Sequence, residues 1–323
     1  MYKCALEFVT HYSARGIPYR VQEDTSVIPI PQAYLDCCEY IYKTRVDAEA
    51  GALTGGSGFF VGAKLEENKD STQLYVVTAK HVLRGMEHPV LRVNVAEGGV
   101  DYLTTDRASW VGHPDGDDLA VCQIEIEYGK YSMRCAFVED FVDYRKNSLL
   151  YPGDEVFMVG RFFSHEGKQQ NAPSVRFGNI SMLAMETMKT FEDYDQRTFL
   201  VEQRSLPGYS GSPVFVFLDP SQPRPPMWMV AINRAGKINL ETTGPWLLGV
   251  DWVHIQNYEE VLESTAPKKI AVPLRYVKVN TGMAGVIPAW RIADIINSEE
   301  FVMYRRKEDQ RISEQKRTTS YQS

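Results

Sequence analysis

The amino-acid sequence predicts an all-β protein made of two antiparallel six-stranded β-barrels, followed by a C-terminal helix. Short runs of β-branched and aromatic residues, separated by turn residues, recur between residues 59 and 287. Six or so of these runs precede residue 145, which suits one small barrel, and a second series follows. After Pro288, apolar residues change to a helical spacing. These three observations define the expected fold class.

The first barrel is expected within residues 36–145. Residues 59–63 and 73–78 are apolar runs on either side of a charged loop, which is typical of a β-hairpin. Residues 1–35 contain three prolines and fit an extended N-terminal segment better than a long helix. Further strands of this barrel are expected at residues 91–95, 110–111 and 119–126.

The second barrel, with its closing helix, is expected within residues 146–303. Residues 219–226 contain four prolines, which cannot donate to a strand ladder, so this stretch predicts a surface loop. Residues 290–301 predict the closing helix, and the charged residues 304–323 predict a polar tail that is frayed or disordered. The expected strands are residues 155–161, 175–182, 198–204, 213–218, 227–233, 246–253 and 283–287.

Composition narrows the class of function. The 323 residues are 44% hydrophobic and 24% charged, which are ordinary values for a globular chain. The net charge of −7 disfavours binding to nucleic acid or to an anionic membrane, because both need a basic face. No apolar run reaches the length of a transmembrane helix. We therefore expect neither a nucleic-acid nor a membrane partner, and composition assigns no oligomeric state.

The cysteines indicate a reducing compartment. The chain has five, Cys4, Cys37, Cys38, Cys122 and Cys135, an odd number without a CxxC pair. This pattern favours neither a disulfide framework nor a zinc site. The N-terminal residues lack the apolar stretch and small-residue cleavage site of a secretory signal. A cytoplasmic protein that needs no metal or organic cofactor is the simplest expectation.

Three segments carry residues for acyl transfer. His81 follows the apolar run 75–77, Asp118 precedes the apolar residues 119–121, and Ser210 lies in the glycine-flanked sequence 208–213. A serine hydroxyl is a poor nucleophile near neutral pH, so it needs an imidazole base and a carboxylate that orients this base. His81, Asp118 and Ser210 can fill these roles.

The choice of carboxylate has alternatives. Asp115, Asp117 and Asp118 lie close together, and a solvated acidic turn or a cation site with His113 would use the same residues. Asp118 is favoured because it lies where the chain enters a buried strand. An α/β-hydrolase elbow is a rival interpretation of Ser210. That motif would need glycine where Ser212 stands. Its residues follow the order serine, acid, histidine along the chain, whereas only His254 follows Ser210 here.

The three segments, in this order, resemble those of trypsin-like (chymotrypsin-fold) serine peptidases, above all the disulfide-free bacterial HtrA-like group. Residues 56–62 resemble the strand before the catalytic histidine, and residues 153–160 the strand that opens the second barrel. Residues 175–181 and 282–288 are similar to later strands of that barrel, so the resemblance spans roughly residues 36–300. It implies a serine endopeptidase that cleaves a protein or peptide substrate through an acyl-enzyme.

The resemblance also implies roles for other residues. The backbone N–H groups of Gly208 and Ser210 would form the oxyanion hole. The specificity pocket would be formed by Arg204, Asp251, Trp252 and Gly285. Arg204 would favour an acidic or small substrate residue if it lies at the pocket base, and otherwise would be a solvated loop charge. Tyr209 stands where digestive relatives carry the aspartate used in activation, so N-terminal cleavage is not expected to activate this chain. The alternative function is a catalytically silent peptide-binding or scaffold protein on the same fold.

Overall fold

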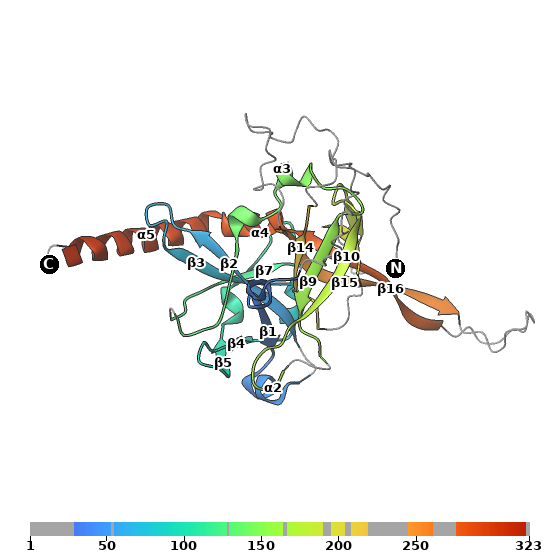
Figure 1. Ribbon diagram of the computed structural model, residues 1–323, viewed down its shortest axis with the longest axis horizontal. Coiled ribbons are helices and arrows are strands. Elements are labelled where there is room, and N and C mark those ends of the chain that lie inside the picture. Colours follow the sequence, from blue (N-terminus) through green and yellow to red (C-terminus); the bar gives the residue numbers. More distant parts are fainter. Residues whose placement is uncertain are drawn as a thin grey trace, which may run out of the picture. The chain divides into compact units, whose positions relative to one another are not determined.

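The computed structural model describes residues 29–52, 55–127, 129–163, 167–189, 195–203, 208–218, 245–260 and 276–320 (Figure 1). The chain divides into two compact units, Met1–Pro31 and Gln32–Ser323. Every element named below lies in the second unit. The predicted strand at residues 227–233 and the predicted proline-rich loop at residues 219–226 lie outside the described residues.

The N-terminal half forms an eight-stranded, mainly antiparallel sheet instead of the predicted closed barrel. Its strand order is β5-β4-β1-β2-β3-β7-β6, and β8 pairs in parallel with β2. Among the described strands, β5 and β6 end the path without pairing with each other, and β6 has only three residues, which offer little backbone for closure. The strands are β1 (Cys38–Tyr42), β2 (Gly56–Lys64), β3 (Thr72–Thr78), β4 (Val90–Asn94), β5 (Val100–Thr104), β6 (Trp110–Gly112), β7 (Ala120–Ile124) and β8 (Ala136–Phe137).

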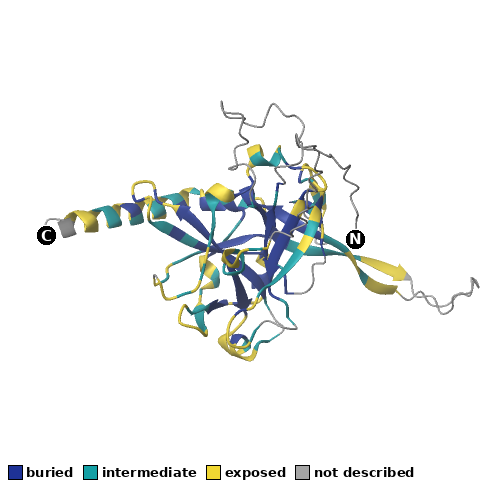
Figure 2. Cartoon of the chain, viewed as in Figure 1, coloured by how far each residue is buried: buried dark blue, intermediate teal, exposed yellow. Residues whose placement is uncertain are grey.

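The core of this sheet explains its order. The central strands β2 and β3 are almost entirely buried, and Figure 2 shows the strands as the dark interior of the chain. Phe60 and Val76 are neighbours across β2 and β3, and both belong to a buried cluster with Ile41, Leu91 and Ala120. Burial of such side chains stabilises the fold by roughly 1.5 to 3 kcal/mol each. The strands richest in apolar residues therefore occupy the middle of the sheet.

The second barrel closes with six strands, as predicted. The order is β10-β13-β16-β15-β14-β9, and β9 pairs back with β10. A short hairpin of β11 (Thr187–Lys189) and β12 (Asp195–Arg197) lies outside this barrel. The barrel strands are β9 (Glu155–Gly160), β10 (Ser174–Met182), β13 (Phe199–Glu202), β14 (Pro213–Val216), β15 (Trp246–Glu260) and β16 (Tyr276–Pro288).

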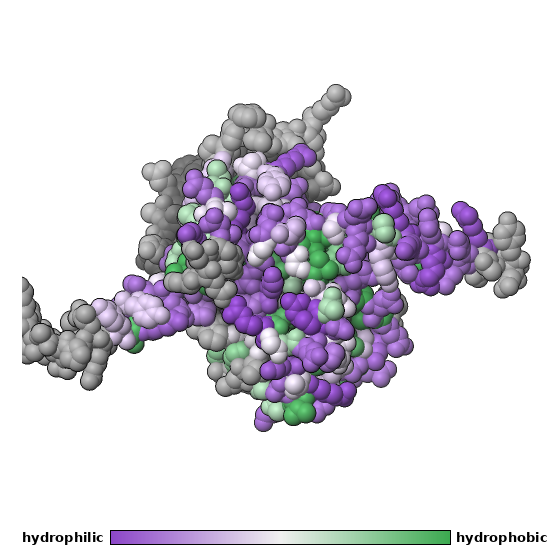
Figure 3. All heavy atoms as spheres, turned by 180° about the vertical axis from the view of Figure 1, so that it is seen from behind, coloured by the Kyte–Doolittle hydropathy of each residue, from purple (hydrophilic) through white to green (hydrophobic). Residues whose placement is uncertain are grey.

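The C-terminal region contains two helices where one helix and a polar tail were predicted. Helix α4 (Ala289–Ile296) buries its apolar residues, and its last turn is capped at Asn297. Helix α5 (Glu299–Ser320) continues through the predicted tail. Mostly hydrophilic residues cover α5 on the face shown in Figure 3. The remaining helices are short: α1 (Gln32–Leu35), α2 (Arg45–Ala50), α3 (Tyr144–Asn147) and the 3₁₀ turns η1 (Lys80–Leu83), η2 (Arg107–Ser109) and η3 (Val138–Asp140).

Polar contacts with the first sheet and the loop after β2 explain why α5 is an ordered helix. The Asp309 carboxylate accepts the backbone N–H groups of Glu67 and Asn68, at 2.8 and 3.0 Å, from the loop after β2. Arg305 donates to the Tyr75 hydroxyl at 2.9 Å. These partners lie more than 200 residues away in sequence, so the composition of the tail alone does not indicate them. Within the described part of the chain, no helix is long and apolar enough to cross a membrane.

Candidate active site

His81 lies in the short turn η1, directly after strand β3. Val82 and Leu83 of the same turn are buried in the core of the first sheet and fix its position. The backbone N–H of Lys80 donates to the Asp118 carbonyl at 3.1 Å. The imidazole itself keeps about a third of its surface exposed, at 33%. A buried anchor therefore presents a side chain that solvent and substrate can reach.

Asp118 contacts His81 at two points. Its Oδ2 lies 2.5 Å from His81 Nδ1, and its Oδ1 accepts the His81 backbone N–H at 2.7 Å. The Asp118 side chain is only 9% exposed. Its own backbone N–H donates to Gln196 Oε1 at 2.9 Å, a contact from β12 that no sequence motif signalled. This arrangement sets both the position and the orientation of the imidazole.

The neighbouring acids have different partners. Asp117 Oδ2 lies 2.5 Å from Arg291 Nε of helix α4, and Asp115 Oδ2 lies 2.8 Å from Arg291 Nη2. His113 Nδ1 lies 3.2 Å from the same Nη2. The guanidinium thus occupies the place that a cation would take in the alternative interpretation of this cluster. Of the three aspartates, the structure brings Asp118 to His81.

Ser210 lies in the tight turn between β13 and β14. The turn needs glycine on both sides, because Gly208 and Gly211 have φ values of +102° and +88°. A Cβ on Gly211 would lie only 2.0 Å from the Ser57 carbonyl oxygen. Gly211 N–H donates to the Asp251 carbonyl at 2.7 Å, which ties the turn to β15. The nucleophile candidate is therefore held on a constrained backbone.

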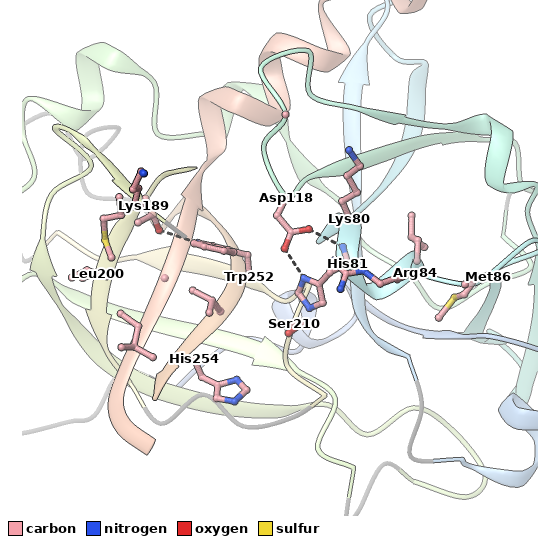
Figure 4. Close-up of a pocket in the computed structure, with 18 of the residues that line it drawn as sticks. Lys80, His81, Arg84, Met86, Asp118, Lys189, Leu200, Ser210, Trp252 and His254 are labelled. Carbon is pink, nitrogen blue, oxygen red and sulfur yellow. Dashed lines mark hydrogen bonds and ion pairs between the residues drawn. The ribbon is translucent and has the colours of Figure 1, made fainter. Parts of the chain in front are cut away.

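His81, Asp118 and Ser210 line one pocket with a cavity volume of about 910 Å³ (Figure 4). Among the described residues, no hydrogen bond joins the Ser210 hydroxyl to His81. Trp252 and Gly285, both predicted to bind substrate, also line this pocket. Asp251 is fully buried and contributes backbone contacts to the serine turn. Arg204 lies outside the described residues, as do residues 205–207 next to the candidate oxyanion-hole residue Gly208.

The pocket contains residues that the sequence interpretation did not single out. His254 lines the wall two residues after Trp252 on β15. Burial, together with the charges of Lys278 and His81, lowers the pKa of the His254 imidazole. Thr198 Oγ1 accepts the Trp252 indole N–H at 3.1 Å. The two-residue period of a strand did not signal these residues, because the register of β15 shifts between Asp251 and Val253 and four consecutive residues, 252–255, line the pocket.

Comparison with known proteins agrees with this architecture. Residues 56–217 match the trypsin-like peptidase domain family. The chain belongs to the trypsin-like peptidase family. The matched residues include His81, Asp118 and Ser210 of this trypsin-like peptidase domain. No curated protein matches its sequence.

Several solved structures match this chain in a structural comparison. The protease domain of MamO from Magnetospirillum magneticum, in its apo form, has 16% sequence identity and a TM-score of 0.44, covering 82% of this chain and 98% of its own. The HtrA-type protease AlgW with tripeptide has 14% identity and a TM-score of 0.45, covering 83% of this trypsin-like peptidase and 62% of its own chain. Deg5 has 18% identity and a TM-score of 0.40, covering 69% of this chain and 81% of its own.

Proposed function

We propose that this trypsin-like peptidase is an active serine endopeptidase. In the proposed reaction, His81 Nε2 takes the proton of the Ser210 hydroxyl while Oγ attacks the scissile carbonyl carbon. The imidazolium then protonates the leaving amine, which leaves an acyl-enzyme on Ser210. A water molecule, deprotonated by His81, hydrolyses this ester and restores the serine. The substrate class is a protein or peptide, and the reaction needs no metal or organic cofactor.

The observation that carries the proposal is the contact of 2.5 Å between Asp118 Oδ2 and His81 Nδ1, inside the pocket that Ser210 lines. A carboxylate at Nδ1 selects the tautomer that leaves Nε2 free to accept a proton, and it stabilises the imidazolium that forms. The Ser210 hydroxyl must come within about 2.6 to 3.2 Å of Nε2 for proton transfer, and such contacts often tighten when substrate binds. The two-point contact with Asp118 holds the ring ready for this step.

The backbone N–H groups of Gly208 and Ser210 are proposed to stabilise the oxyanion. Positive φ at Gly208 supports this role, because such a backbone conformation lets nearby N–H groups of the turn converge on one point. Removing one such donor costs about 10² to 10³ in kcat in enzymes of this mechanism. Trp252 and Gly285 are proposed to shape the wall that receives the substrate side chain. Arg204 is proposed to favour acidic residues before the scissile bond.

Labelling with a fluorophosphonate probe tests the proposal, because the probe reacts with an activated serine. We expect stoichiometric labelling of the wild type at Ser210. Ser210→Ala and His81→Ala should each abolish labelling and lower kcat for peptide cleavage by about 10⁴ to 10⁶, without additivity in the double variant. Ser109→Ala and His88→Ala, which alter exposed residues, are the matched controls.

The outcomes separate the candidate functions. Labelling that persists in Ser210→Ala would move the nucleophile to another residue. A folded wild type that is never labelled and never cleaves peptide would favour the catalytically silent peptide-binding protein.

A further inference from the structure

Ser57, near the start of strand β2, connects the first sheet to the serine turn. It is fully buried. Its hydroxyl Oγ donates to the Gly208 carbonyl at 2.8 Å, and its backbone N–H donates to the Ser210 carbonyl at 2.8 Å. Gly208 lies 151 residues further along the chain. One residue of the first sheet thus holds two carbonyls of the turn that carries the candidate nucleophile.

The direction of the hydroxyl bond is set by a second contact. The backbone N–H of Arg161 donates to Ser57 Oγ at 2.9 Å. A hydroxyl has one proton to donate, so with an N–H group bound to its oxygen, that proton is directed to the Gly208 carbonyl. Hydrogen bonds in such a chain polarise and strengthen one another.

Arg161 itself is firmly placed. Its side chain is fully buried, with the guanidinium carbon 4.1 Å from the ring centre of Tyr42 and 4.5 Å from that of Phe163. Its Nη2 donates to the Ala52 carbonyl at 2.5 Å. The backbone N–H that binds Ser57 therefore belongs to a residue with little freedom to move.

The serine turn also presses closely against the backbone of β2. A Cβ on Gly56 would lie 2.7 Å from the Ser210 carbonyl oxygen, and a Cβ on Gly211 would lie 2.0 Å from the Ser57 carbonyl. That same carbonyl accepts the Thr78 hydroxyl at 2.7 Å, three residues before His81. Ser57 is therefore in contact with both the nucleophile turn and the strand that leads to the base.

We propose that Ser57 is a positioning residue for catalysis, a role that rests on the proposed peptidase function. By holding the carbonyls of Gly208 and Ser210, it restricts the ψ rotation of both residues, and so limits the backbone motion that would turn their N–H groups away from the oxyanion. A side chain that only filled space would need no hydroxyl. Here the hydroxyl bonds leave the residue's own sheet and end on the turn and on Arg161.

Ser57→Ala tests this role by steady-state peptide hydrolysis and by the rate of fluorophosphonate labelling. We expect kcat and the labelling rate to fall about 10- to 100-fold, the scale of a small misplacement of catalytic groups. KM should stay within about twofold, because Ser57 does not line the pocket. A residue that only stabilised the fold would lower Tm without changing kcat of the folded fraction, so Tm is measured in parallel.

Ser212→Ala is the matched control. Ser212 is also fully buried near Ser210, but its hydroxyl has no hydrogen-bond partner in the described part of the chain. Its loss should change kcat by less than about threefold. Should Ser57→Ala not fold, Ser57→Cys preserves the volume while offering only a weak donor. It should lower kcat about tenfold.

The outcomes distinguish this role from the proposed function. Suppose that the wild type is labelled at Ser210 and that a folded Ser57→Ala or Ser57→Cys variant has the same kcat and labelling rate as the wild type. This result overturns the role of Ser57 and leaves the peptidase function standing. An equal loss in Ser212→Ala also overturns the role of Ser57, because the loss would then reflect any buried hydroxyl near the turn. A wild type without labelling or cleavage overturns the peptidase function and the role of Ser57 with it.

Discussion

Asp117 and Asp118 are adjacent in the sequence but contact different partners. Asp118 Oδ2 lies 2.5 Å from His81 Nδ1, whereas Asp117 Oδ2 lies 2.5 Å from Arg291 Nε on α4. Both side chains are nearly buried, at 9% and 2% exposure. Only one of the two carboxylates can therefore orient the imidazole, while the other ties the same loop to the C-terminal helix.

Asparagine substitutions at these two positions should separate the two roles. Asp118→Asn should lower kcat by about 10⁴, because an amide can stabilise the wrong tautomer of His81, and should leave the fold largely intact. Asp117→Asn should lower kcat by much less. Peptide hydrolysis, with circular dichroism as the check on folding, measures both. The reverse ranking would assign the orienting role to Asp117.

The ion pair between Asp117 and Arg291 should contribute mainly to stability. Breaking a buried pair by removing one partner leaves an uncompensated charge and costs about 3 to 5 kcal/mol. Arg291→Met should therefore lower the free energy of unfolding by an amount of this order, and the Arg291→Met and Asp117→Leu double variant should lose less than the sum of the two single variants. Urea denaturation measures the cycle. Losses that simply add would contradict a direct interaction.

Gly285→Ala should impair substrate binding. A Cβ at residue 285 would lie 2.7 Å from Val253 Cγ1 and 2.8 Å from Trp252 Nε1, so the indole must shift from its bond to Thr198. Overpacking of this kind costs about 1 to 3 kcal/mol. We expect KM for peptide substrates to rise several-fold. Gly112→Ala is the control, since its nearest contact would be an ordinary 3.6 Å. An unchanged KM would place the substrate elsewhere.

The thiols should react in an order that follows burial. Cys37, Cys38 and Cys122 are buried, and Cys135 is partly exposed. Burial raises the pKa of Cys122 to about 12 and that of Cys135 to about 11, so little thiolate is present at pH 8. Mass spectrometry during native alkylation should show Cys135 modified ahead of the three buried thiols. Denatured, unreduced protein should gain five adducts in total, and finding disulfides instead would refute the reducing-compartment interpretation.

Glu39 should make stability fall as pH rises. Burial, reinforced by the charge of Asp36, raises the pKa of the Glu39 carboxyl well above its usual range. The folded chain then keeps a proton that the unfolded chain loses above about pH 4.3, so the free energy of unfolding falls by up to about 1.4 kcal/mol per pH unit until the folded pKa is passed. Glu39→Gln should remove this contribution to the slope above pH 5 in urea denaturation, whereas the exposed Glu186→Gln should not. An unchanged slope in Glu39→Gln would contradict the assignment.

The sequence by itself determined the elements whose signals are local. The second barrel was predictable because most of its strands contain a short run rich in apolar residues between turn residues, and its closure is confirmed by the pairing of β9 with β10. His81, Asp118 and Ser210 were selected as candidates from the few residues around each, and all three line one pocket. Their catalytic roles stay a prediction. The predicted pocket residues Trp252 and Gly285 line the cavity, whereas the part played by Arg204 stays a prediction.

Only the tertiary structure decided the features that depend on distant partners. Among the strands that the structure describes, the two ends of the first sheet do not pair, and α5 is held by contacts with residues more than 200 positions away. The separation of Asp118 from Asp117 depends on Arg291, 174 residues after Asp117, and the link from Ser57 to Gly208 spans 151 residues. A local pattern records which face of a strand or helix is apolar, but a buried polar group is satisfied by whichever partner the folded chain brings within hydrogen-bond distance.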